Sequence, residues 1–271
     1  MRGRIVGMLR VGTPVEDYRE EYGLWVKRED LACPPPGPPF SKTRGVYAHL
    51  LTSPEQIIGA LDTRHSQAGH AVARACQVLG KKCVCFYPQL KYAPEPKESQ
   101  LKAEALGAEL RGLKGWSMGP QQVLFHIAKR QVLELGGYMM PNALALKESV
   151  EETAKEVPAG DFDCVIVSVS SGTLAAGVIR GFERSGRHPR YLLHLGYSKH
   201  QSKKRRYLET ASGFTTANIQ LIDEGYNYKD EARAGETPPW PCNEYYDLKA
   251  FRWWLAHRAE YEGRVLFWNI G

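Results

Sequence analysis

The sequence of 271 residues contains no apolar run close to the roughly 18 residues that a membrane-spanning helix needs. Its first residues also lack the apolar segment of a signal peptide, so we expect a cytoplasmic protein. Cysteine is scarce: there are six, and their spacing matches no zinc motif. We therefore expect no metal site, and free thiols in a reducing compartment. Internal repeats and low-complexity tails are missing as well.

Acidic residues are the minority among the charged ones. The chain has 36 basic and 30 acidic side chains, a net charge of +6. The excess is concentrated in one basic run, Lys199–Arg206. Such a run is either a solvated helix face or a contact for an anionic macromolecule such as DNA or for a phosphate-bearing substrate. The sequence leaves both interpretations open.

Short apolar runs alternate with helical patterns along the chain. The expected strands are 24–27, 56–61, 82–87, 164–169, 191–195, 219–223 and 265–268. The expected helices are 67–79, 96–106, 120–135, 146–156, 172–184 and 246–258. Alternation of strands and helices predicts an α/β fold with parallel sheets and helices on both faces. Ligands of such folds bind at the carboxyl ends of the strands, next to helix N-termini.

Lys42 follows a proline-rich loop, Pro34–Pro39, and stands at the mouth of a helix. Burial and the positive end of a helix both disfavour an ammonium group, so a lysine in this place is a candidate nucleophile or Schiff-base former. The alternative is a solvated surface charge. The loop is either a surface connector or a wall of the active-site entrance.

A second motif, residues 164–177, indicates a buried strand, a turn of small residues and a helix. Backbone N–H groups in such a turn, together with the helix dipole, can hold a phosphate group. Ser170, Ser171 and Thr173 add hydroxyl groups around Gly172. Tight packing of the strand against the helix is the alternative explanation for the small residues.

The order of Lys27–Leu31 and Pro39–Gly45 resembles that in the pyridoxal-phosphate (PLP) enzymes of the tryptophan synthase β-like fold, fold type II. These include threonine synthase, aminocyclopropane-carboxylate deaminase and D-cysteine desulfhydrase. Their K-x-E-D strand end leads through a loop to a segment such as S-F-K-D-R-G. The resemblance places Lys42 on the lysine that binds PLP. It also places the turn of small residues on the phosphate loop, G-S-G-G-T, where Val169 and Ser171 replace two glycines.

Three other segments resemble motifs of this family. His65–Ala71 is similar to S-G-N-H-G-Q-A, which puts Gln67 on the asparagine that contacts the phenolic oxygen of PLP and Ser66 just before it. Glutamine is one methylene longer, so this contact is lost or reshaped. The late segment 265–271 is similar to the strand and H-T-G-G turn of the family, and Asn269 keeps its polar character.

The third segment, Pro241–Ala250, is similar to P-V-Y-E-G-K-S of the deaminase. Asp247 falls on the acidic residue that pairs with the pyridine nitrogen, and Tyr246 on the tyrosine that lies over the substrate. A carboxylate in that position keeps the pyridine nitrogen protonated and the ring a strong electron sink. The alternative is that Asp247 caps the following helix.

The resemblance extends from Thr13 to Gly271 and implies a compact version of the two-domain fold. Residues 1–50 with 141–271 would form a large PLP-binding domain, and residues 51–140 a small domain, with the cofactor in the cleft between them. We expect a homodimer. The expected catalytic residues are Lys42, Tyr246 and Ser66. The expected cofactor-binding residues are Lys42, Gln67, Ser170, Ser171, Gly172, Thr173, Asp247 and Asn269.

The main functional hypothesis is a PLP-dependent lyase that acts at the α-carbon of a small amino acid by deamination or β-elimination, through an external aldimine and a quinonoid. The alternative is decarboxylation or trimming of an amino acid attached to a modified DNA base, as in phage DNA hypermodification. The shortened small domain, the basic run and the acidic partner of the pyridine favour this alternative. A third hypothesis is an inactive homologue that still binds PLP.

Overall fold

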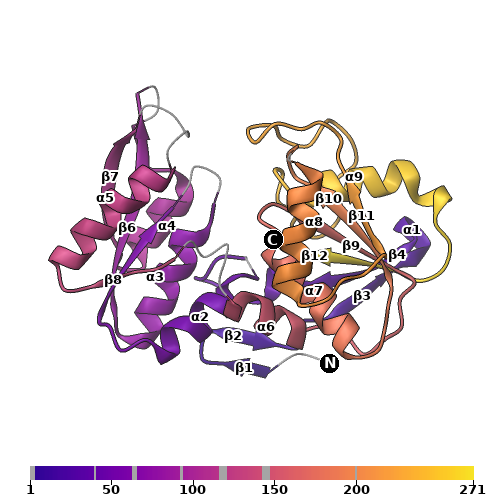
Figure 1. The fold of residues 1–271 in the computed structure, drawn as a ribbon, viewed down its shortest axis with the longest axis horizontal. Coiled ribbons are helices and arrows are strands. Elements are labelled where there is room, and N and C mark those ends of the chain that lie inside the picture. The colour runs from indigo at the N-terminus through magenta and orange to yellow at the C-terminus, as the bar shows by residue number, and fades with distance from the viewer. Residues whose placement is uncertain are drawn as a thin grey trace.

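The computed structural model describes residues 4–39, 41–62, 66–91, 94–115, 121–141, 147–198 and 200–271. Two separate sheets, each with its own helices, stand side by side (Figure 1). Both are parallel apart from one edge strand of the larger sheet. Among the described residues, none of the helices has both the length and the apolarity of a membrane span.

The larger sheet has the strand order β11-β10-β9-β12-β4-β3, and only β3 is antiparallel to its neighbour. Its strands are β3 (Val15–Tyr18), β4 (Leu24–Arg28), β9 (Cys164–Val169), β10 (Arg190–Leu195), β11 (Ile219–Ile222) and β12 (Val265–Asn269). Helices α7 (Thr173–Arg184) and α8 (Gln201–Ser212) cover one face and α9 (Asp247–His257) the other. Successive residues of a strand point to opposite faces. Accordingly, Val165 and Val167 pack with α7, and Ile166 packs with α9.

The smaller sheet has the order β7-β6-β5-β8. Its strands are β5 (Ile57–Leu61), β6 (Lys82–Leu90), β7 (Glu109–Gly115) and β8 (Tyr138–Met139). Helices α3 (Ala68–Leu79) and α4 (Glu98–Ala105) pack on one face and α5 (Gln121–Glu134) on the other. The boundaries of the two predicted domains stay a prediction.

The remaining elements join the two layers or extend them. They are β1 (Arg4–Val6), β2 (Leu9–Val11), α1 (Arg19–Tyr22), the 3-10 turns Glu29–Leu31 and Arg258–Glu260, α2 (Thr43–Thr52) and α6 (Lys147–Lys155). Helix α2 packs against both α6 and α3, so it connects the layer of the larger sheet with that of the smaller one. The C-terminus lies on the side of the larger sheet that faces the smaller one (Figure 1).

The α/β fold and all seven expected strands are confirmed, with shifts of a few residues at their ends. The six expected helices are present as well. Strands β1, β2, β3 and β8 have two to four residues, too few for a periodic pattern to show. The edge strand β7 was missed for another reason: it contains three charged residues and two glycines, a composition that the sequence pattern assigns to a loop.

Candidate active site

Lys42 is the residue directly before α2, and its side chain is 6% exposed. Burial and, secondarily, the positive charge of Lys204 lower the pKa of Lys42 to about 7. Much of its amine is therefore neutral at neutral pH, which is the form that attacks a carbonyl carbon. The neighbouring Ser41 donates its backbone N–H to the carbonyl of Ile270 at 3.2 Å. The buried hydroxyl of Ser41 has no hydrogen-bond partner among the described residues.

The turn between β9 and α7 has the conformation expected of an anion-binding loop. Gly172 adopts φ = +102°, a value that glycine reaches without strain, directly before the first residue of α7. No other residue type has a positive φ in the described part of the chain. Val169 and Ser171, which replace glycines of the family motif, therefore occupy positions that do not require glycine. This explains how the loop tolerates both replacements.

Lys204 of α8 holds this turn through two of its backbone carbonyl groups. Its amine donates to the carbonyl oxygens of Ser170 at 2.7 Å and Ser171 at 2.9 Å. The C=O and N–H groups of a trans peptide point in opposite directions. The N–H groups of Ser171 and Gly172 therefore point away from Lys204, and with the N-terminus of α7 they form a cradle for an anion.

The hydroxyl groups of the turn form a small cluster. The buried Thr173 Oγ1 lies 3.0 Å from the hydroxyl of Tyr207 and 3.2 Å from Ser171 Oγ. The ring of Tyr207 packs against Gly172 so closely that a Cβ atom there would come within 3.1 Å of it. Sequence analysis missed both Lys204 and Tyr207 as site residues, because both reach the turn from α8, about thirty residues further along the chain.

Asp247 is completely buried, and its carboxylate accepts three hydrogen bonds. The donors are Ser168 Oγ at 2.6 Å and the backbone N–H groups of Ile270 at 3.3 Å and Gly271 at 3.2 Å. Asp247 is the first residue of α9, the N-cap position belongs to Tyr246, and all three bonds of the carboxylate go to groups outside α9, so the helix-cap alternative is wrong. Burial raises the pKa of Asp247 to about 7 in spite of these bonds. A cationic partner such as a protonated pyridine nitrogen would offset this cost of burial.

Tyr246 lies at the carboxyl end of the larger sheet, next to strand β10. A Cβ atom on Gly196, the residue after β10, would come within 2.5 Å of its ring, so glycine is needed there for the close approach. Burial, followed by the nearby Tyr228, raises the pKa of Tyr246. The phenol is therefore neutral at physiological pH and can donate a hydrogen bond. The rings of Tyr197 and Tyr228 meet edge to face, with centroids 5.1 Å apart.

Ser66 and Gln67 belong to the layer of the smaller sheet, at the start of α3. Ser66 Oγ accepts a hydrogen bond from the N–H of Ala68 at 3.0 Å, whereas Gln67 makes no capping bond with its side chain. Helix α3 packs against α2, which begins directly after Lys42. The proline-rich loop contacts α3, because His70 Nε2 lies 3.0 Å from the carbonyl oxygen of Pro36. The roles of Ser66 and Gln67 stay predictions.

Asn269, the last residue of β12, uses its amide within the protein. Its Nδ2 donates to Asp30 Oδ1 at 2.9 Å and to the carbonyl of Pro241 at 2.8 Å, and its Oδ1 accepts from the thiol of Cys242. Those bonds fasten the segment before Asp247 to the end of β4. They favour a positioning role for Asn269 over the predicted contact with the cofactor.

A buried ion network holds α2, and hence Lys42, in place. Arg44 Nε lies 3.1 Å from Glu29 Oε2, and Arg44 Nη1 lies 3.2 Å from Glu156 Oε1. Lys27 Nζ lies 3.3 Å from Glu156 Oε2 and donates to the carbonyl of Thr13 at 2.7 Å. The two cations and two anions balance, as burial requires. The segment Lys27–Leu31, which marked the family motif, thus acts by positioning α2.

Together these groups fit PLP. The carboxyl ends of the strands in the larger sheet bring together the amine of Lys42, the anion cradle and the carboxylate of Asp247. Parallel-sheet folds bind their ligands at these ends. Ile270 links two of them, because it accepts from the backbone of Ser41 and donates to Asp247. Lys204 links the third group, the cradle, with Lys42, because its amine bonds the cradle and its charge acts on Lys42.

Comparison with known proteins agrees with this geometry. The model of a family described as pyridoxal-phosphate dependent enzymes matches residues 8–195. The chain is similar to a glycyl-dTMP PLP-dependent decarboxylase of Pseudomonas phage M6, with 45% identity over 282 residues that cover 97% of this chain and 100% of the relative.

Solved structures resemble the fold. An aminocyclopropane-carboxylate (ACC) deaminase homologue superposes with a TM-score of 0.80 at 18% identity, over 100% of this chain and 91% of that one. Threonine deaminase isoform 2 from Solanum lycopersicum superposes with a TM-score of 0.65 at 14% identity, over 97% and 80%. The fold is therefore the tryptophan synthase β-like fold of fold type II, and the chain belongs to the family of pyridoxal-phosphate dependent enzymes.

Proposed function

We propose that this protein is a PLP-dependent decarboxylase that removes the carboxyl group of a glycyl unit carried on a thymidine nucleotide. The observation behind the proposal is its 45% identity, over the full length of the relative, to the phage enzyme of that name. The similarities to deaminases are all below 25% identity and concern the fold. The comparisons thus favour decarboxylation of a nucleotide-bound amino acid over deamination of a free one.

The site residues suit this reaction. Bound PLP supplies a carbon that a primary amine can attack and an electron sink for the electron pair that remains at the α-carbon when CO₂ leaves. Asp247 lies buried where it can hold a positive charge at one end of the site. A proton must then replace CO₂ at the α-carbon, and Lys42, with its pKa near 7, can both hold and release a proton at neutral pH.

The reaction has a direct test. Incubated with a thymidine nucleotide that carries a glycyl unit with a free amine, the enzyme should release CO₂ and leave a product lighter by one CO₂ and still bearing its amine, detected by mass spectrometry. Deamination would release ammonia instead. Free glycine and 1-aminocyclopropane-carboxylate serve as control substrates. Turnover of those controls, with none of the nucleotide, would contradict the proposal.

Loss of one hydroxyl group from the anion cradle should lower the affinity for PLP more than it lowers the turnover of the PLP-loaded enzyme. Thr173→Val removes a buried donor near the phosphate dianion, a charge-assisted bond worth roughly 1.5–3 kcal/mol. PLP affinity, titrated by absorbance, should fall roughly tenfold to a hundredfold. Thr153→Val is the matched control, because Thr153 is equally buried but bonds the carbonyl of Ser149 on α6. Equal affinities of the two variants would place the phosphate elsewhere.

A further inference from the structure

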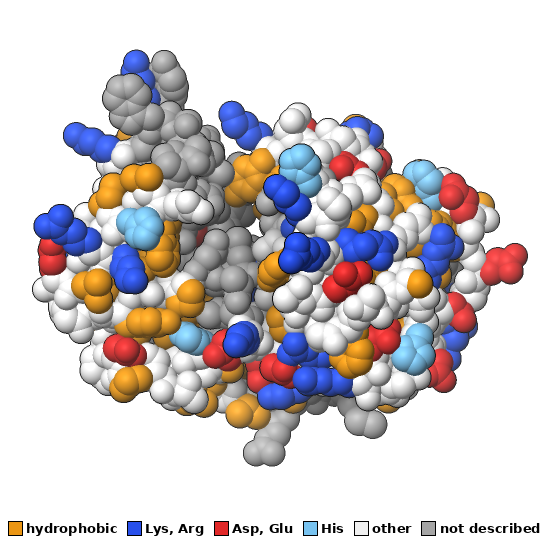
Figure 2. Space-filling view, in the orientation of Figure 1, with side chains coloured by type: hydrophobic (Ala, Val, Ile, Leu, Met, Phe, Trp, Pro, Cys, Tyr) orange, Lys and Arg blue, Asp and Glu red, His pale blue; other side chains and the backbone are white. Residues whose placement is uncertain are grey.

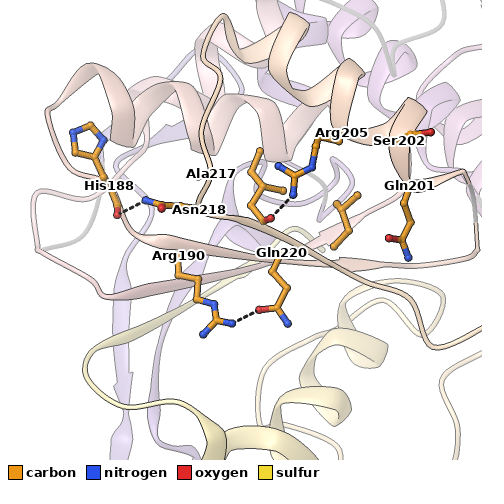
Figure 3. Close-up of a pocket in the computed structure, with 10 residues that line it drawn as sticks. His188, Arg190, Gln201, Ser202, Arg205, Ala217, Asn218 and Gln220 are labelled. Carbon is orange, nitrogen blue, oxygen red and sulfur yellow. Dashed lines mark hydrogen bonds between the residues drawn. The ribbon is translucent and has the colours of Figure 1, made fainter.

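A polar groove of about 830 Å³ runs along the outer edge of the larger sheet, between β11 and α8 (Figure 3). None of the site residues predicted from the sequence lines it. Its floor is the edge strand β11, and its walls come from the first half of α8 and the start of β10. The lining contains two arginines and several amide and hydroxyl side chains but no carboxylate.

Both arginines are fastened in place by β11. Arg205 Nη2 donates to the carbonyl of Ile219 at 2.6 Å, and Arg190 Nη2 donates to Gln220 Oε1 at 2.6 Å (Figure 3). A guanidinium has five N–H donors, so these bonds orient each group and leave further donors for a ligand. Arg205 reaches β11 from α8, whereas Arg190 and Gln220 lie on the α9 face, where Arg190 stacks over the ring of Tyr261 at 5.0 Å. The two guanidinium groups therefore flank the edge strand from its two faces.

The N-terminus of α8 adds to the positive potential of the groove. Gln201 and Ser202, the first two residues of this twelve-residue helix, line one end, and the first turn contains no acidic residue. The first N–H groups of a helix have no partner within the helix and carry a partial positive charge. At the other end the Nδ1 atom of His188 lies 2.7 Å from Glu183 Oε2, so this ring nitrogen is already engaged by a carboxylate.

The face of the molecule that carries α7 and α8 has both basic and acidic side chains (Figure 2). On α7, Arg180 and Arg184 are paired with Glu151. On α8 itself Lys203 and Arg206 are exposed, whereas Lys204 is buried under the anion cradle. The described basic residues of the run thus point in different directions, and Lys199 lies outside the described residues. Among the described basic residues of this run, Arg205 is the one that lines the groove, together with Arg190 of β10.

We propose that this groove binds the sugar–phosphate backbone of DNA, so that the enzyme acts on glycyl-thymidine within the polymer and not only on the free nucleotide. The inference rests on the proposed function for the substrate and goes further by naming the polymer and its contact surface. Its basis is charge complementarity: one oriented guanidinium group on each face of the edge strand and a helix N-terminus line the groove, and none of its lining residues is a carboxylate. Helix α8 takes part in both places, because Arg205 lines the groove and Lys204 bonds the anion cradle.

The test compares two pairs of substitutions in the PLP-loaded enzyme, with fluorescence anisotropy of a labelled DNA duplex measured over a salt series. Arg190→Gln with Arg205→Gln should lower the slope of log affinity against log salt by about two, because each phosphate contact contributes about 0.9. Lys129→Gln with Arg130→Gln on α5 removes the same charge far from the groove and should leave the slope unchanged. The double variant with Arg190→Lys and Arg205→Lys keeps both charges, so it should keep most of the slope of the parent enzyme.

A second pair of variants leaves Arg190 and Arg205, and their hydrogen bonds to β11, unchanged. Ser202→Glu places a negative charge in the groove at the second residue of α8, where an acidic residue favours the helix. Gln122→Glu does the same at the second residue of α5. Weaker DNA binding in the first variant alone supports the groove. Equal effects in both pairs, or a parent enzyme whose binding to DNA does not depend on salt, would overturn it.

Failure of this inference is distinct from failure of the proposed function. Decarboxylation of the free glycyl nucleotide without binding of DNA would support the proposed function and contradict the DNA contact at the groove. Binding of DNA through Arg190 and Arg205 without decarboxylation of either form of the substrate would support the DNA contact and contradict the proposed function. Inorganic phosphate and dTMP serve as competitors: release of the duplex by either at low concentration would indicate a single-anion site and contradict a backbone contact.

Discussion

Replacing Lys42 by alanine is expected to reduce turnover by roughly 10³-fold or more and to abolish the reduction-stable link between the cofactor and the chain. The amine is buried, and both causes that act on its pKa, burial and the charge of Lys204, favour the neutral nucleophilic form. Loss of a nucleophile that also transfers protons removes two large catalytic contributions. Borohydride reduction of the wild-type enzyme, followed by peptide mapping, should place the pyridoxyl group on Lys42.

Lys249 is the natural control for this experiment. It is also buried, and burial lowers its pKa to about 8, but its amine donates to the carbonyl of Gly196 at 2.6 Å and lies 4.3 Å from the ring centroid of Tyr226. Lys249→Ala should therefore keep the reduction-stable link. A pyridoxyl group mapped to Lys249 would overturn the assignment of Lys42.

Asp247→Asn should retain PLP but reduce turnover by roughly 10²- to 10³-fold, the usual effect of removing one electrostatic contribution to the transition state. Asparagine cannot keep the pyridine nitrogen protonated, so the electron pair left at the α-carbon is less stabilised. Steady-state turnover and the cofactor titration, measured on the same preparation, separate the two effects. Wild-type turnover in this variant would show that Asp247 acts only by holding Ile270 and Gly271.

The same substitution has a second readout in the cofactor-free protein. Burial raises the pKa of Asp247 from 3.8 to about 7, so the folded state binds this proton more tightly than the unfolded state does. The stability from this proton is present at low pH and is lost as pH rises from about 4 to about 7, a change on the order of 4 kcal/mol. Asp247→Asn should thus melt above the wild type at about pH 8 and close to it at about pH 5.

The order of motifs and their local patterns already determined much of this protein. Strand–helix alternation predicted the α/β fold. The resemblance of the lysine segment, the turn of small residues and the late Tyr-Asp pair to motifs of a known family predicted a PLP enzyme. These signals are readable because each depends on a few neighbouring residues. Gly172, for instance, is the one position of its turn where the backbone requires glycine.

Only the tertiary structure decided which distant side chains meet. Glu156 balances Lys27 and Arg44 from more than 100 positions along the chain, and the N–H groups of the anion cradle are turned outward by a lysine of another helix. The basic run looked uniform in sequence, but helical geometry turns Lys204 inward and Arg205 towards β11. Such contacts depend on how helices pack on a sheet, and no periodicity in the sequence records the packing partner.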